Sequence, residues 1–128
     1  MLLQNINVLK MDYVKRNSTD LKILRDFFNS TVRRDFVKRI ADHPDVINRL
    51  SSSQRELLQA GVIPKGYSVH HKLPLDDTGT NDFSNLVLIR NTTEHSVFTT
   101  TQNAISRGMA PGEHRTVLWP VPKGVIYP

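Results

Sequence analysis

The sequences YSVHH at residues 67–71 and LVLI at residues 86–89 decide the fold. Both are short runs of apolar and aromatic residues, which favours strands, and a Pro-Lys-Gly turn signal precedes the first run. Residues 73–84 between them are rich in Asp, Thr, Gly and Asn and contain one Pro, a composition typical of a loop. The two runs therefore predict a hairpin whose second strand is buried.

A helix is expected directly after this hairpin. Asn91 or Thr92 can cap its first turn, and Arg107-Gly108 can end it near Ser106. Its inward stripe consists of Val97, Phe98, Thr101 and Ile105. The predicted order is strand, loop, strand, helix.

A longer helical region is expected before the hairpin, at residues 18–60. Apolar residues recur there every three or four positions, at Leu21, Leu24, Phe28, Val32, Phe36 and Ile40. The candidate N-caps are Ser18, Thr19 and Asp20. Pro44 begins a short helix that ends at Leu50, and a capping box at residues 53–56 opens another helix that Gly61 ends. These elements predict a helical scaffold.

Length and composition predict a single domain, and the expected elements make it α+β, with an N-terminal helical layer packed on the strand and helix unit. The 128 residues include no cysteine, which excludes disulfides and thiolate chemistry, and no apolar run reaches the roughly 18 residues of a membrane span. The predicted parts are the scaffold at residues 1–63, the strand and helix unit at 64–107, and an extended Pro-rich tail at 108–128. Without a recognisable secretion signal, we expect synthesis in the cytoplasm. A formal net charge of +5 favours a polyanionic partner.

Three histidines cluster in the strand and helix unit. His70 and His71 lie on the first predicted strand, and His95 lies on the first turn of the predicted helix. Neighbouring residues of a strand point to opposite faces, so His70 and His71 are poorly placed to bind one metal together. We therefore expect one of them to bind a metal with His95 and the other to act as a general base.

These residues resemble the HNH, or ββα-metal, nuclease motif. The matching features are VHHK at residues 69–72, the Gly- and Asn-containing loop, NLVLI at residues 85–89, and His95 ten residues after Asn85. A looser likeness, in residues 61–67, 108–113 and the tail, is to C-terminal nuclease toxin domains of bacterial polymorphic toxins.

The resemblance implies a role for each matched residue. His70 and His95 would be metal ligands, His71 the general base, and Asn85 the residue that braces the loop and orients the base. A histidine base must be neutral near pH 7, which its ordinary pKa of about 6.5 allows. Taken alone, Asn85 would be an ordinary turn residue.

One divalent metal ion is the implied cofactor. Where the bacteriocin form of the motif has a further histidine, this chain has Thr99, which is more often a helix-surface residue than a ligand. Two imidazoles and waters leave Mg²⁺, Zn²⁺, Mn²⁺ and Ni²⁺ all open. Asp76 and Asp77 are interpreted as turn formers.

Basic residues flank the motif on both sides. Phosphate contacts are expected from Lys72, Arg90, Arg107 and Arg115. A second basic group on the helical scaffold, interpreted mainly as a solvated face, comprises Arg33, Arg34, Lys38 and Arg39. His43 and His114 have no evident partner, and His114 is the better candidate to approach the site because it follows the motif helix.

The sequence thus predicts a metal-dependent endonuclease acting on DNA with low sequence specificity. As a toxin domain it would have an acidic immunity protein as antagonist and would reach a target cell through a larger parent protein or an adaptor. A zinc-stabilised nucleic-acid-binding module that cleaves nothing is the alternative, although structural zinc needs four protein ligands. An HNH nuclease with an RNA, homing, restriction or phage role also remains open.

Overall fold

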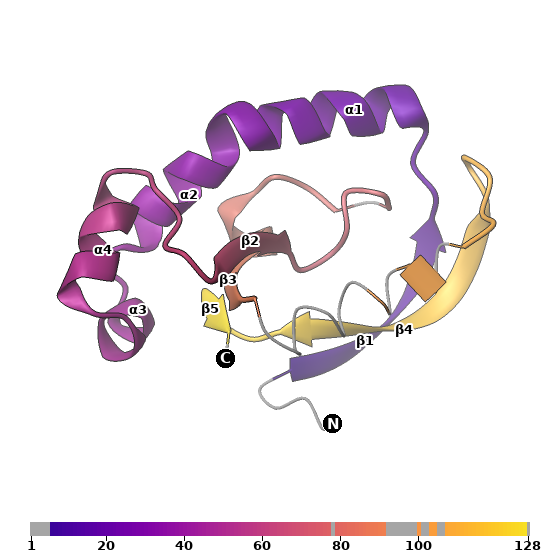
Figure 1. The fold of residues 1–128 in the computed structure, drawn as a ribbon. Coiled ribbons are helices and arrows are strands. Elements are labelled where there is room, and N and C mark those ends of the chain that lie inside the picture. Colours follow the sequence, from indigo (N-terminus) through magenta and orange to yellow (C-terminus); the bar gives the residue numbers. More distant parts are fainter. Residues whose placement is uncertain (1–5, 78, 92–99, 101–102, 105–106, 128) are drawn as a thin grey trace.

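The computed structural model describes residues 6–77, 79–91, 100, 103–104 and 107–127 (Figure 1). The protein is a mixed α+β fold, as the sequence predicts. In chain order its elements are β1 (Ile6–Val14), α1 (Ser18–Phe27), the π-helical turn η1 (Phe28–Val32), α2 (Arg33–Ile40), α3 (Pro44–Arg49), α4 (Ser52–Gln59), β2 (Tyr67–His71), the 3-10 turn η2 (Phe83–Asn85), β3 (Leu86–Arg90), β4 (His114–Pro122) and β5 (Ile126–Tyr127).

The predicted hairpin forms two of the three strands of a small sheet, with β3 in the middle. Strands β2 and β3 pair antiparallel, and β5 joins the other edge of β3 in parallel. Leu86 and Leu88 of β3 pack into the core under the helices, whereas Val87 and Ile89 pack with Tyr127 on the opposite face. Because β3 is buried on both faces, its sequence is a continuous apolar run rather than an alternating one.

A second sheet consists of β1 and β4, which pair antiparallel along their whole lengths. Tyr13 is fully buried and packs with Trp119, at a distance of 5.9 Å between the ring centroids. In the region expected to be an extended tail the structure has β4 and β5, whereas residues 6–14, expected to belong to a helical scaffold, form the strand β1. This strand forms because the tail supplies its hydrogen-bonding partner.

One long helical arch, made of α1, η1 and α2, passes over the hairpin (Figure 1). Its buried residues Phe28, Val32 and Phe36 are spaced by four. In a regular α-helix, residues four apart drift by about 40° around the axis, since a turn contains 3.6 residues. The π turn, closed by a bond from the Arg33 N–H to the Phe28 carbonyl, offsets this drift and keeps the apolar row facing the core.

The helix starts differ slightly from those expected. Asn17, rather than a residue at 18–20, caps α1, because its side chain accepts a hydrogen bond from the Asp20 N–H at 2.9 Å. The capping box of α4 joins Ser51 and Gln54, two residues before the predicted one. The expected left-handed Gly61 follows this helix, with φ of +78°. These differences leave the helical scaffold at residues 18–60 in place.

The helix expected after the hairpin falls largely outside the described residues. Thr100, Asn103 and Ala104 are helical. The predicted cap Asn91 instead accepts a hydrogen bond from the Ser68 hydroxyl at 2.6 Å, which closes the open end of the hairpin. Among the described residues, the helices are all too short or too polar to cross a membrane.

Candidate functional site

The two neighbouring histidines lie on different faces of β2. His71 pairs in register with Leu86, whose side chain belongs to the core under the helices. His70 pairs with Val87, which packs on the other face of the sheet. The register therefore places the two residues on opposite faces of the strand, as strand geometry predicts, although both also line the cleft described below.

His71 lies against the helical arch. Its ring packs on Phe28, with 4.4 Å between the ring centroids. Its Nε2 atom is 2.9 Å from the Asn81 Oδ1 atom. Burial lowers the pKa of His71 below the ordinary value of 6.5; the Asn81 hydrogen bond opposes this effect and the positive charge of Arg25 adds to it. His71 is therefore neutral at pH 7.

Asn81 determines which nitrogen of His71 carries the proton. The Asn81 Nδ2 atom donates to the Leu24 carbonyl of α1 at 3.0 Å, so its Oδ1 atom must face His71 as an acceptor. Nε2 of the neutral imidazole consequently carries the hydrogen, and Nδ1 keeps its lone pair. Such a nitrogen can accept a proton from a water molecule.

A cleft of about 260 Å³ lies beside His71, between the helical arch and the hairpin. We call it the histidine cleft; its lining residues are Arg25, Phe28, Asn29, Val69, His70, His71, Pro74, Leu75 and Asp76. It brings together two histidines, Arg25, an apolar wall and Asp76, whose carboxylate is bound by Lys15 and Tyr13. This combination suits a small anionic group such as a phosphodiester.

Asn85 braces the loop that follows His71. Its Oδ1 atom accepts a hydrogen bond from the Leu73 N–H at 2.8 Å, and its Nδ2 atom donates to the Leu73 and Thr80 carbonyls at 3.0 and 2.8 Å. The direct contact with His71, however, comes from Asn81. Asn85 thus holds the loop that carries Asn81, and its influence on His71 is indirect.

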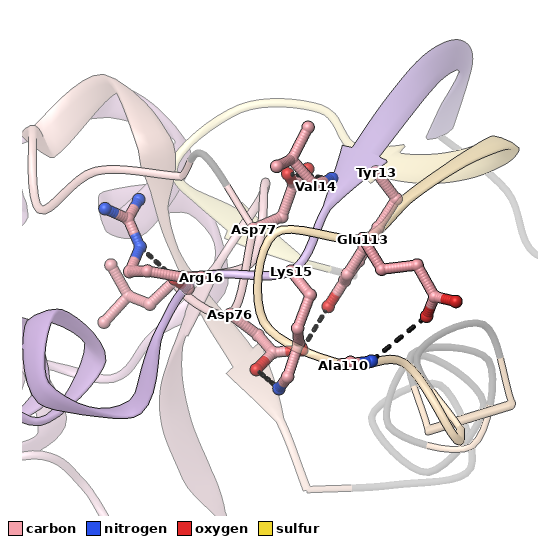
Figure 2. A network of polar contacts seen from close by, with 9 residues as sticks. Tyr13, Val14, Lys15, Arg16, Asp76, Asp77, Ala110 and Glu113 are labelled. Atoms are coloured by element: carbon pink, nitrogen blue, oxygen red, sulfur yellow. Dashed lines mark hydrogen bonds and ion pairs between the residues drawn. The ribbon is translucent and has the colours of Figure 1, made fainter.

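The acidic pair of this loop serves as an anchor to β1 (Figure 2). The Asp76 carboxylate accepts hydrogen bonds from the Tyr13 hydroxyl, at 2.5 Å, and from the Lys15 ammonium, while Asp77 accepts from the Val14 N–H at 2.7 Å. Both aspartates are buried. These long-range contacts go beyond the turn-forming role expected from the sequence.

Arg16 ties the same loop down from its other side. Its guanidinium donates to the Leu75 and Gly79 carbonyls at 2.7 and 3.0 Å. Gly79 is required here, because a Cβ atom on it would lie 2.0 Å from the Leu73 carbonyl oxygen. The loop wall of the histidine cleft is therefore fixed by backbone contacts.

The C-terminal tail contacts the hairpin directly after His71. Trp119 of β4 donates its indole N–H to the Lys72 carbonyl at 2.9 Å. Burial lowers the pKa of the Lys72 ammonium. Lys72 is therefore half-buried at the junction of the two sheets, whereas a typical phosphate-contacting lysine is solvated.

The predicted phosphate-contacting cations are dispersed. None of Lys72, Arg90, Arg107 and Arg115 is among the described residues that line the histidine cleft. Arg90 pairs with Tyr67 at the far end of the hairpin, about 13 Å along the strand from His71. Arg115 pairs with Tyr13 on the other sheet. The cation that does line the cleft is Arg25.

The remaining histidines have other partners. His43 caps α3, its Nδ1 atom accepting from the Asp45 N–H at 3.1 Å. His114 lies 2.8 Å from the Asp12 carboxylate on the β1–β4 sheet, and it is not among the described residues lining the histidine cleft. The expectation that it approaches the site is therefore not met.

The predicted metal centre has one described member. His95 and Thr99 lie outside the described residues, and within the described part of the chain no three His, Asp or Glu side chains gather to hold a metal. His70 is half-buried and lines the histidine cleft, and imidazole is a good ligand for divalent transition metals. The described donors therefore fit a two-histidine site only if His95 supplies the second imidazole.

Three residues of this site were missed from the sequence: Arg25, Phe28 and Asn81. Arg25 and Phe28 belong to an amphipathic helix more than forty positions before His71, and nothing local marks them as cleft residues. Asn81 lies in a polar loop, where an asparagine is expected for turn formation alone. Only the packing of the arch on the hairpin distinguishes them.

The molecule is therefore an α+β protein with a histidine-bearing cleft between a helical arch and a hairpin. A curated relative is Uncharacterized protein YhhZ from Escherichia coli (strain K12), which is 44% identical over 127 residues, covering 99% of this chain and 32% of that protein. The chain thus spans about a third of the length of this relative. No family model matches the chain, and no solved structure matches it.

Proposed function

We propose that the chain is a metal-dependent endonuclease of the HNH type that hydrolyses DNA phosphodiester bonds with little sequence specificity. The observation that carries this proposal is the state of His71: neutral, packed on Phe28, and held by Asn81 so that Nδ1 retains its lone pair. Among the described residues it is the side chain best prepared to accept a proton.

In the proposed reaction, His71 Nδ1 takes a proton from a water molecule in the histidine cleft. The water oxygen forms a bond to phosphorus while the bond from phosphorus to the 3′ oxygen breaks. The departing 3′ oxygen takes a proton from solvent, which leaves a 5′-phosphate and a 3′-hydroxyl. Arg25, which lines the same cleft, would contact a non-bridging phosphate oxygen and offset its growing charge.

A divalent metal ion would be held by His70 and His95. When bound, it would supply Lewis-acid polarisation of the phosphodiester and stabilise charge on the leaving oxygen. No contact among the described residues identifies the metal, so Mg²⁺, Zn²⁺, Mn²⁺ and Ni²⁺ should each be tested.

The proposed biological role is that of an antibacterial effector domain neutralised by an acidic immunity protein. Two facts support it: the formal charge of +5, and a relative in which the matching region makes up 32% of a longer chain, as for a module carried by a larger protein. An acidic antagonist would be captured rapidly by a basic surface.

The test is a cleavage assay on supercoiled plasmid and on total RNA, with each of the four metals and with excess chelator. Wild-type protein should nick and linearise plasmid only with metal, and His71→Ala should lose about 10²- to 10⁴-fold in rate. His114→Ala is the matched control, since its imidazole pairs with Asp12 on the other sheet, and it should retain activity. Equal cleavage in chelator would refute the metal dependence, and degradation of RNA alone would change the substrate.

A further inference from the structure

A second cleft adjoins the histidine cleft on the helical arch. It has a volume of about 370 Å³, and its lining residues are Asn29, Ser30, Arg33, Arg34, Gly61 and Ile63. Asn29 lines both clefts, so the two meet at this residue. The two clefts are therefore neighbours along the arch, and we refer to them together as one groove that leads away from His71.

Helical spacing places the arginines of this groove in a row. Arg25, Asn29 and Arg33 are four residues apart, and the π turn at residues 28–32 keeps this row, like the buried one, from drifting around the axis. Eight residues at 1.5 Å each separate Arg25 from Arg33 by about 12 Å. This length is enough to contact more than one phosphate of one DNA strand, since successive phosphates of a strand rise by about 3.4 Å along the duplex axis.

Gly61 makes room for Arg34 beside this row. A Cβ atom on Gly61 would lie 2.4 Å from the Arg34 Cγ atom and 2.9 Å from the Lys38 Cε atom, so the two long side chains lie across a bare backbone. The Arg34 guanidinium donates to the Ser30 carbonyl at 3.1 Å, which leaves further N–H groups for a ligand. Arg34 is thus held at the wall of the groove.

The charged residues that line the groove are mostly arginines: Arg25 in the histidine cleft, and Arg33 and Arg34 in the second cleft. The described acidic member of the groove is Asp76, whose carboxylate is already bound by Lys15 and Tyr13. Guanidinium groups bind phosphate oxygens through paired N–H donors, and such contacts fix position without reading bases. A row of them leading to a histidine cleft therefore suits a phosphodiester backbone.

We propose that Arg25, Asn29, Arg33 and Arg34, here named the arginine groove, bind the phosphate backbone of the DNA strand that is cut and lead its scissile phosphate to His71. This inference rests on the proposed nuclease function and assigns the substrate path to the helical arch. It replaces the dispersed cations expected from the sequence as the principal phosphate contacts.

Binding of a labelled random-sequence duplex, measured by fluorescence anisotropy in excess chelator over a range of salt, tests the groove separately from cleavage. Arg33→Ala should weaken binding and reduce the slope of log affinity against log salt by about 0.9, the loss of one phosphate contact. Arg33→Lys should restore the slope. The matched control is Arg39→Ala, which removes the same charge from α2 but lines a different cleft with Phe36 and His43; its slope should equal that of wild type.

The outcomes separate the two proposals. Equal slopes for Arg33→Ala and Arg39→Ala, with both variants folded by circular dichroism, would overturn the groove, as would salt-insensitive binding by wild-type protein. If Arg33→Ala weakens binding but wild-type protein cleaves nothing with any of the metals, the arginine groove stands and the proposed nuclease function is refuted. If wild-type protein cleaves with metal but Arg33→Ala binds DNA normally, the nuclease function stands and the arginine groove is refuted.

Discussion

Replacing Asn81 by alanine removes the acceptor of the His71 Nε2–H bond and the donor to the Leu24 carbonyl. The imidazole would keep its packing on Phe28 but could then adopt either neutral tautomer and rotate about its bond to Cβ. A neutral hydrogen bond stabilises one arrangement by about 0.5–1.5 kcal/mol, which corresponds to a loss of about 2- to 13-fold in the population of the productive form. The cleavage rate should fall by the same factor.

The assay is a double-mutant cycle on plasmid nicking at saturating metal, with wild-type protein, Asn81→Ala, His71→Ala and the double variant. Since Asn81 acts through His71, its removal should have no further effect once His71 is alanine. Thr80→Ala is the control, because the Thr80 hydroxyl bonds to the neighbouring Asp82, and it should keep the wild-type rate. An equal loss from Asn81→Ala with and without His71 would refute the positioning role.

Three further predictions concern the same hairpin. His70→Ala and His95→Ala should weaken metal affinity in calorimetric titration and regain activity in excess metal. His71→Ala should bind metal normally but lose cleavage. If His71→Ala loses the metal while His70→Ala keeps it, the two roles are reversed. Asn85→Ala, which loses three hydrogen bonds to the loop backbone, should lower the free energy of unfolding in urea by about 2–4 kcal/mol, and a loss within error of zero would contradict the brace. Burial lowers the pKa of His71, so the unfolded chain binds more protons than the folded chain as the pH falls below 6.5. The free energy of unfolding should therefore decrease over this pH range. His71→Asn should reduce this pH dependence, and an unchanged dependence would contradict the role of His71.

Local patterns predicted the hairpin and the helices, but not the partners that complete them. Strand β2 has the predicted bounds, because a turn signal and an abrupt loop delimit it. Strand β1 was missed although Leu9, Met11 and Tyr13 alternate as in a half-buried strand, since a two-stranded sheet needs a partner that lies far along the chain. The cap of α4 was misplaced because Ser51, Ser52 and Ser53 offer equivalent hydroxyls.

For the candidate site too, local patterns predicted some residues, and tertiary packing determines the others. The histidines and Asn85 follow from a local motif, and the distinct surroundings of His70 and His71 follow from strand geometry. Asn81, Arg25 and the arginine groove depend on how the arch crosses the hairpin, and helical periodicity alone gives no such contact. Arg33 and Arg34 are exposed, in agreement with their interpretation as part of a solvated helix face, and their role in the arginine groove is a proposal.

The pairing of β1 with β4 constrains the order in which the molecule can fold. Asp12 and His114, which meet across this sheet, are 102 residues apart, and β5 must also reach β3 before the hairpin core is closed. Closing so long a loop has an entropic cost that slows folding. During synthesis the hairpin emerges from the ribosome before β4 and β5, the strands that complete the two sheets, have been made. The complete native fold should therefore form only after translation has passed residue 127, and nascent chains arrested earlier should be readily proteolysed.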